Sequence, residues 1–157
     1  MAEPAWLERC ASFGIADCPS SADPWHNPPM IDHTGIHVSQ PAVSRAFYEA
    51  ALAPLGYSVL REIPTQFTGG MVVFGMGVAP KPDFWIAQGS PETPRLHIAF
   101  RAESRAAVDA FYAAAIAVGG RDNGPPGPRP HYHEHYYGAF VLDPDGHNIE
   151  AVIHTPA

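Results

Sequence analysis

An internal repeat is the feature that most constrains the fold of this chain of 157 residues. Shifting the sequence by 64 residues gives nine identities in the 24 positions from 33 to 56. The informative matches are a histidine, an aromatic pair and a glycine: His33 with His97, Phe47-Tyr48 with Phe111-Tyr112, and Gly56 with Gly120. Self-similarity at a fixed period indicates that two similar structural units build the domain.

Each copy has the pattern of a strand, an amphipathic helix and three short strands. In the first copy we expect a strand over 30–39, a helix over 41–56 and strands over 57–63, 70–77 and 83–88. In the second copy we expect a strand over 95–102, a helix over 104–120 and strands within 126–142 and over 148–154. The Pro-rich segment "GPPGPRP" is a poor strand. The sequence thus predicts an α+β fold made of two βαβββ modules, 30–90 and 94–156.

Composition separates residues 1–29, which we interpret as a partly irregular N-terminal extension, from the domain over 30–156. A hydrophobic content of 46% is typical of a globular protein, and a formal charge of −7 without a basic run argues against nucleic acid or an anionic membrane as partner. No apolar stretch has the length of a membrane span, and the N-terminus lacks the apolar core of a signal peptide. We therefore expect a cytoplasmic protein in which Cys10 and Cys18 are reduced.

Strand alternation assigns three chemically active side chains to one side of the predicted sheets. Ile149, Ala151 and Ile153 take the face that the helices cover. His33, His97 and Glu150 take the opposite face. Two imidazoles and one carboxylate form a ligand set for a divalent ion, Fe, Mn, Ni, Co or Zn, with positions left open for substrate. Each histidine alone also fits an ordinary structural residue, but the repeat places the two at equivalent positions.

From about residue 31 to 154 the chain resembles the vicinal oxygen chelate superfamily, which includes glyoxalase I, extradiol dioxygenases and bleomycin-resistance proteins. The resemblance is carried by "IDHTGIHVS", "SRAFYEAALAPLG", "RLHIAF", "DAFYAAAIAVGG" and, most specifically, by "AFVLDPDGHNIEAV". It implies paired βαβββ modules that form an open, cup-shaped sheet with the helices outside. It also implies a metal held by His33, His97 and Glu150.

The sequence departs from each well-known branch of that family. Glyoxalase I has a fourth ligand where Trp85 stands, and a glutathione-binding arginine where His37 stands. Extradiol dioxygenases have a tyrosine at the position of Phe140 and a histidine near Pro82 or Asp83. A fosfomycin transferase has the same tyrosine, and a threonine at the position of Gly35. The resemblance therefore predicts the metal but not the reaction.

Several further residues are candidates for the pocket. The candidates for proton transfer are His37, His135 and Tyr137, and those for the substrate wall are Trp85, Phe140, Tyr136 and His154. In "HYHEHYY" we expect His131, His133 and His135 to share one strand face with Tyr137. Arg95 and Arg101 are either solvated or meet an anionic substrate, and His147 is expected at the surface or in a turn.

Two functions remain open at this point. The first is a metal-dependent enzyme that acts on a small oxygen-rich molecule by lyase, isomerase or dioxygenase chemistry. The second is a non-enzymatic protein of the bleomycin-resistance kind that binds a small molecule or drug. The modules can pair within one chain or between the chains of a homodimer, and the sequence leaves both arrangements open.

Overall fold

The computed structural model describes residues 31–156, so the predicted extension and its two cysteines lie outside the described residues. The first module contains β1 (Thr34–Val38), α2 (Pro41–Leu52), the 3-10 turn η1 (Ala53–Leu55), β2 (Ser58–Ile63), the 3-10 turn η2 (Thr65–Phe67), β3 (Val73–Gly77) and β4 (Phe84–Gln88). The second contains β5 (His97–Arg101), α3 (Arg105–Ala117), β6 (Arg121–Pro128), β7 (Tyr137–Leu142) and β8 (Asn148–Ile153). The predicted α+β class with two βαβββ modules is confirmed.

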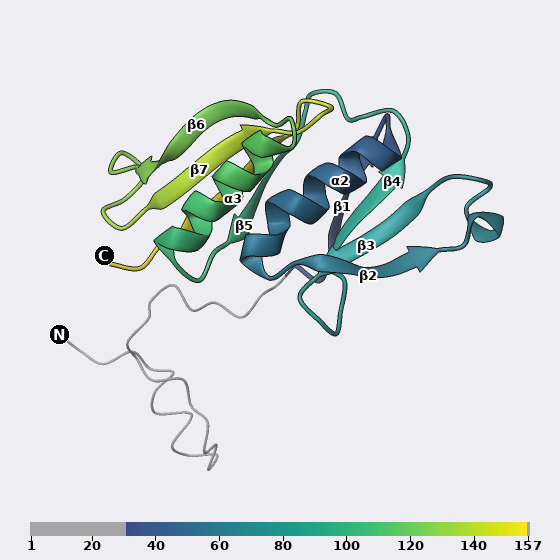
Figure 1. The fold of residues 1–157 in the computed structure, drawn as a ribbon, viewed down its shortest axis with the longest axis horizontal. Helices are drawn as coiled ribbons and strands as arrows, with labels where there is room; N and C mark the ends of the chain where they lie inside the picture. Colours follow the sequence, from purple (N-terminus) through teal and green to yellow (C-terminus); the bar gives the residue numbers. More distant parts are fainter. Residues whose placement is uncertain (1–30, 157) are drawn as a thin grey trace, which may run out of the picture. The chain divides into compact units, whose positions relative to one another are not determined.

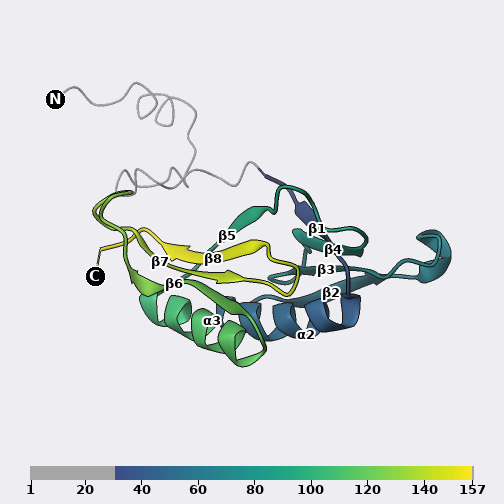
Figure 2. The same cartoon turned by 90° about the horizontal axis from the view of Figure 1, so that it is seen from above.

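Each module forms its own four-stranded mixed sheet, and neither sheet is closed. The strand orders are β1-β4-β3-β2 and β5-β8-β7-β6, so the same topology occurs twice. In both sheets the first strand pairs in parallel with the last, and the other pairs are antiparallel. Figures 1 and 2 show α2 and α3 side by side on the same side of the two sheets. Within residues 31–156, no helix covers the opposite face of either sheet.

Local sequence signals set the ends of both helices. Helix α2 begins at Pro41, whose missing N–H costs nothing in the first turn. The η1 turn that continues it ends at Gly56, which adopts a φ of 81° that glycine tolerates without strain. Helix α3 begins after Ser104, whose side chain accepts a hydrogen bond from the backbone N–H of Ala107. Within residues 31–156, neither helix has the length and apolar character that crossing a membrane requires.

One hydrophobic core lies between the helices and the sheets and joins the two modules. Helix α2 buries Phe47 and Leu52, and α3 buries Phe111. The ring of Phe100 on β5 meets the rings of Phe84 and Tyr57 from the first module edge to face, each at 5.2 Å. Contacts of this kind make the two modules of residues 32–156 one packed unit.

Strand β6 shows how the Pro-rich segment enters a sheet. It runs through "RDNGPPGP" at the edge of the second sheet, where a proline that cannot donate a ladder hydrogen bond is tolerated. Its pairing with β7 shifts register between Asp122 and Gly124 and again between Gly124 and Gly127. The segment is therefore a strand despite its composition, because only one of its edges has to pair.

Candidate functional site

A row of side chains crosses the uncovered face of the second sheet. Ala99 on β5 pairs with Glu150 on β8, and Glu150 pairs with Phe140 on β7. Residues that pair directly across two strands point to the same face. His97, two residues before Ala99, points to this face as well, and its ring lies 6.1 Å from that of Phe140. We call His97, Glu150, Phe140 and Tyr136 the module 2 site.

Glu150 is the centre of the module 2 site. Its side chain is only 2% exposed, although a carboxylate is costly to bury unless it is paired. One carboxylate oxygen, Oε2, lies 2.8 Å from Nε2 of His97, and the other, Oε1, accepts a hydrogen bond from the hydroxyl of Tyr136. His97 is 53% exposed, so the pair is open to solvent on the histidine side. The carboxylate is thus fixed by two partners and remains accessible through one of them.

Tyr136 reaches Glu150 because the intervening strand position is a glycine. A Cβ atom on Gly138 would lie 3.1 Å from Oε1 of Glu150 and 3.1 Å from the Tyr136 ring. Burial and the hydrogen bond to Glu150 raise the pKa of Tyr136 well above its ordinary value. The hydroxyl therefore keeps its proton at neutral pH and acts as a donor to the carboxylate.

A pair of histidines lies beside Tyr136. Nε2 of His133 is 2.8 Å from Nδ1 of His154, and the Tyr136 ring centroid is 5.0 Å from that of His154. Burial, followed by the charge of His133, lowers the pKa of His154. Of the four predicted pocket residues, Tyr136, Phe140 and His154 are thus gathered in the second module.

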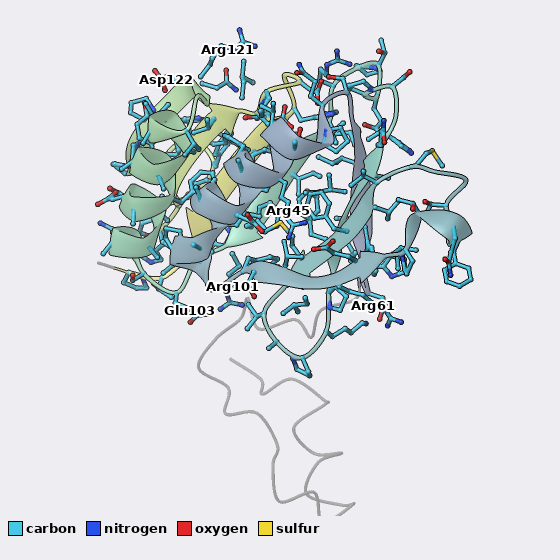
Figure 3. All side chains as sticks on the ribbon, turned by 45° about the vertical axis from the view of Figure 1, so that its right-hand side comes forward. Arg45, Arg61, Arg101, Glu103, Arg121 and Asp122 are labelled. Carbon is cyan, nitrogen blue, oxygen red and sulfur yellow. The ribbon has the colours of Figure 1, made fainter. Side chains whose placement is uncertain are left out.

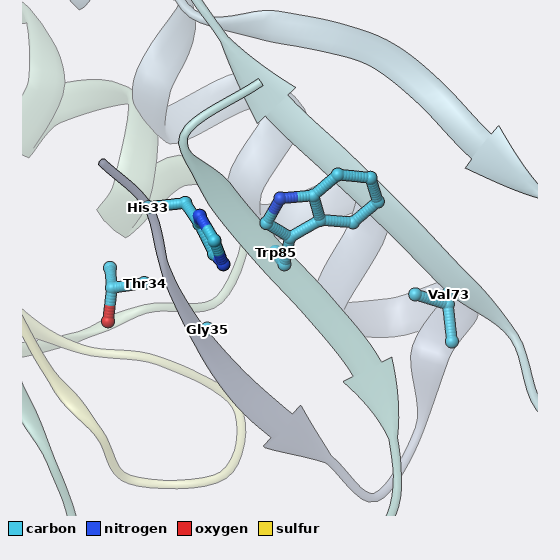
Figure 4. Close-up of a pocket in the computed structure, with 5 residues that line it drawn as sticks. All are labelled: His33, Thr34, Gly35, Val73 and Trp85. Carbon is cyan, nitrogen blue, oxygen red and sulfur yellow. The ribbon is translucent and has the colours of Figure 1, made fainter. Parts of the chain in front are cut away.

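Trp85, the fourth predicted pocket residue, belongs to a separate pocket in the first module. His33, Thr34, Gly35, Val73 and Trp85 line this open cavity of about 460 Å³, which we call the Trp85 pocket (Figure 4). Trp85 pairs with Gly35 on one side and with Gly75 on the other. A Cβ on Gly75 would lie 3.1 Å from the indole ring, so the glycine leaves the space that the ring occupies.

His33 does not join His97 and Glu150 in this structure. Its Nδ1 lies 2.8 Å from Oδ1 of Asp32, and its side chain is 61% exposed. Across residues 31–156, no group of three His, Cys, Asp or Glu side chains is close enough to hold a metal ion. The structure therefore brings together two of the three predicted ligands, and the set of three stays a prediction.

His37 belongs to a polar cluster around the turn that precedes β8. Its Nδ1 lies 2.8 Å from Oε1 of Glu92. Partial burial acts to raise the pKa of Glu92, but the hydrogen bonds from His37, a backbone hydrogen bond of Glu92 itself and the charge of His37 together lower the net pKa. His147, which we expected at the surface or in a turn, is in the turn but completely buried, and its Nδ1 accepts a hydrogen bond from the backbone of Leu96 at 3.1 Å. His37 thus belongs to the polar contacts around the turn before β8 and not to the module 2 site.

The same turn fixes the direction of Glu150. Oδ1 of the buried Asp143 accepts hydrogen bonds from the backbone N–H groups of Asp145 and His147, at 2.9 and 2.8 Å. Its Oδ2 accepts a hydrogen bond of 2.6 Å from the hydroxyl of Tyr48 on α2. A shift of one residue in a strand turns every side chain to the other face, so this anchored turn decides that Glu150 faces away from the helices.

The prediction that Tyr137 shares a strand face with His131, His133 and His135 is wrong. The strand begins only at Tyr137, and residues 131–136 form turns, to which strand alternation does not apply. The hydroxyl of Tyr137 bonds to Asp109 on α3 at 2.8 Å, which places it on the helix side. His135 lies in the turn, where its backbone N–H donates to Nδ1 of His133 at 3.1 Å.

Sequence reasoning missed Arg129, whose guanidinium lies 5.5 Å from the centroid of the Phe140 ring. It considered Arg95 and Arg101 instead. Arg95 donates to the backbone carbonyls of Glu92 and Asp145, at 2.6 and 2.7 Å, and so braces loops. One feature of the sequence could have indicated Arg129: it is the single arginine of the unusual segment "GPPGPRP". The interpretation of this segment as a poor strand gave that arginine no role.

Comparison with known families identifies the domain. The family model of the Glyoxalase/Bleomycin resistance protein/Dioxygenase superfamily matches residues 30–151, which is most of the chain. No protein in a curated set matches the sequence.

Solved structures share the fold. A glyoxalase/bleomycin resistance protein from Albidiferax ferrireducens T118 is 29% identical, with a TM-score of 0.60 over 82% of this chain and 100% of that one. A glyoxalase/bleomycin resistance protein/dioxygenase family enzyme from Burkholderia phytofirmans PsJN is 19% identical, with a TM-score of 0.58 over 80% and 98%. Glyoxalase I from Zea mays is 17% identical, with a TM-score of 0.55 over 81% of this chain and 45% of that one. The last two similarities concern the fold alone.

Proposed function

The chain belongs to the Glyoxalase/Bleomycin resistance protein/Dioxygenase superfamily, and from this premise we propose that it is a divalent-metal-dependent enzyme. Its substrate is a small oxygen-rich molecule whose neighbouring oxygens bind the metal. A bound divalent ion would act as a Lewis acid that stabilises negative charge on those oxygens. The reaction is of the lyase, isomerase or dioxygenase type.

The observation that carries this proposal is the environment of Glu150. A carboxylate that is 2% exposed, 2.8 Å from a half-exposed imidazole nitrogen, presents one oxygen and one nitrogen donor at an open face. These donor types suit Fe, Mn, Ni, Co and Zn. Tyr136 holds the second carboxylate oxygen and so orients the ligand, as partners of metal ligands commonly do.

Metal analysis of the purified protein tests the proposal. After incubation with each of the five metals, we expect the wild type to retain an ion that His97→Ala and Glu150→Gln do not retain. His131→Ala is the matched control, because this histidine is exposed and contacts Tyr132 rather than Glu150. If the wild type retains no more metal than His97→Ala, the metal-dependent function is refuted.

We further propose that the third ligand, His33, is supplied by a second copy of the chain in a homodimer. Supporting this, β1 and β5 are edge strands of different sheets, and His33 lies outside any three-donor group within residues 31–156. Mixing His33→Ala chains with His97→Ala chains tests the arrangement. Ligands from two copies predict that the mixture regains metal binding that each variant lacks alone, whereas ligands from one chain predict no recovery.

Reaction type requires separate assays on the metal-loaded protein. Oxygen uptake with a panel of catechols under Fe(II) tests the dioxygenase type, and hemithioacetal turnover under Ni or Zn tests the glyoxalase type. Phe140 stands where extradiol dioxygenases have a tyrosine, so Tyr136, which donates to Glu150, is the hydroxyl available for proton transfer here. Tyr136→Phe is expected to lower turnover in whichever assay is positive.

The Trp85 pocket favours a second candidate function, the binding of a small molecule without catalysis. An open cavity of about 460 Å³ with an indole wall suits an aromatic compound. Titration of bleomycin into the metal-free protein, with Trp85→Leu and His97→Ala variants, separates the two candidates. Binding that is lost in Trp85→Leu but unchanged in His97→Ala supports the binding function.

A further inference from the structure

Arg129 places a positive charge beside the module 2 site. Its guanidinium carbon lies 5.5 Å from the centroid of the Phe140 ring. Phe140 pairs directly with Glu150, and its ring lies 6.1 Å from that of His97. One phenyl ring is therefore flanked by the guanidinium and by the two residues proposed to bind metal.

The surrounding backbone is shaped to hold this guanidinium. A Cβ on Gly124 would lie 3.4 Å from Nη2 of Arg129, and one on Gly127 would lie 3.1 Å from Nη1. The carbonyls of Pro125 and Pro128 accept hydrogen bonds from Nη2 and Nη1, at 2.7 and 3.2 Å. The glycines and prolines of β6 thus leave room for the side chain and fix its position, which explains the composition of this poor strand.

The charge of Arg129 has no acidic partner among residues 31–156, although the chain has 16 acidic residues and a net charge of −7. Arg45, by contrast, binds both Glu49 and Glu62. Arg129 is half-buried, and two of its five N–H donors are used by the carbonyls. A fixed guanidinium with free donors beside Phe140 favours an oxyanion, because carboxylate and phosphate oxygens match its planar fork.

We propose that Arg129 determines substrate specificity and that the substrate is a small acid. Its neighbouring oxygens bind the metal that His97 and Glu150 are proposed to hold, its apolar middle lies on Phe140, and its carboxylate or other oxyanion group binds Arg129. This inference rests on the proposed function, since it names the substrate class of the same site. Arg129 and Tyr136 lie opposite each other where the loop between β6 and β7 begins and ends. The backbone N–H of Arg129 donates to the carbonyl of Tyr136 at 2.8 Å, and this hydrogen bond holds Arg129 near the module 2 site.

Two probes that differ mainly in charge test the inference. 3,4-Dihydroxybenzoate carries neighbouring oxygens and a carboxylate, and 3,4-dihydroxybenzamide replaces the carboxylate by a neutral amide. We expect calorimetric titration of the zinc-loaded wild type to show that the benzoate binds about tenfold more tightly than the benzamide, or more tightly still. Arg129→Gln should abolish this preference, and Arg129→Lys should retain part of it.

Arg121→Gln is the matched control, because Arg121 (labelled in Figure 3) is an exposed arginine at the first position of β6, whereas Arg129 follows the last position of that strand. It should leave the preference intact. Equal binding of the two probes by the wild type, failure of the wild type to bind the benzoate, or an unchanged preference in Arg129→Gln would each overturn the inference. Thermal unfolding of every variant identifies loss of folding, in which case Arg129→Lys carries the test.

Titration with and without zinc separates this inference from the proposed function. Zinc retention without a preference for the benzoate overturns the inference and leaves the metal-dependent function standing. A preference that persists in protein unable to retain zinc, and that disappears in Arg129→Gln, refutes the metal-dependent function while supporting the role of Arg129 in binding an oxyanion.

Discussion

The two modules have the same topology but present different chemistry on their uncovered faces. The row Gly35, Trp85, Gly75 in the first sheet occupies the same pairing positions as the row Ala99, Glu150, Phe140 in the second. An indole between two glycines forms one wall of an open cavity, whereas a carboxylate beside a histidine presents one oxygen and one nitrogen ligand atom. The repeat thus fixes the positions of the side chains, and the residue at each position decides the chemical character of the uncovered face.

The largest expected effect concerns the core that both modules share. Phe100→Ala should lower the free energy of unfolding by about 3–5 kcal/mol, because it removes a buried ring that meets rings of the first module. Denaturant unfolding measures the loss, with Val43→Ala, an exposed valine on α2, as the control. A change of less than about 1 kcal/mol would show that the modules do not depend on this contact.

Tyr48 on α2 and Tyr112 on α3 occupy equivalent positions of the repeat but differ in burial. Tyr48→Phe should cost about 1–3 kcal/mol, because it leaves a buried oxygen of Asp143 without its donor. Tyr112→Phe, at the repeated position, should change the stability little, since the Tyr112 side chain is partly exposed. Chemical denaturation of both variants measures the difference. Equal losses would contradict the unequal roles of the two tyrosines.

A methyl group added on the uncovered face of each sheet should affect the two modules differently. Gly75→Ala should cost about 1–3 kcal/mol, because its Cβ would lie 2.9 Å from Pro82 and 3.1 Å from the Trp85 indole. Gly138→Ala should cost less, because the flexible end of Glu150 can move, but it should weaken metal binding. Thermal unfolding and metal retention measure the two effects. Gly138→Ala with unaltered metal binding would argue against the fixed carboxylate.

The smallest expected effect is a pH dependence confined to the second module. Burial and the charge of His133 lower the pKa of His154 below its usual 6.5, so the neutral form is favoured in the folded protein. This stabilising contribution is present above pH 6.5 and is lost as the pH falls through the lowered pKa, because the unfolded chain takes up the proton first. His154→Asn should therefore show a smaller fall in Tm between pH 7.5 and 5.5 than the wild type. His131→Asn should behave as the wild type does.

Much of this molecule could be predicted from the sequence. The repeat gave both modules, and the alternation of Ile149, Ala151 and Ile153 correctly assigned Glu150 to the face opposite the helices. Alternation failed at Tyr137, because the residues before it form turns and set no strand parity. It also missed Arg129, whose position depends on two glycines and two carbonyls of an edge strand rather than on any periodic pattern.

The two-module plan follows from the amino-acid sequence, since the period of 64 residues and the strand and helix periodicities are local properties of the chain. Which of the predicted residues contact one another depends on the three-dimensional packing. Distances between side chains depend on how separate sheets pack, and that packing joined His97, Glu150 and Tyr136 in one module and left His33 with Trp85 in the other. It also set the guanidinium of Arg129 beside the Phe140 ring, which no spacing along the chain encodes.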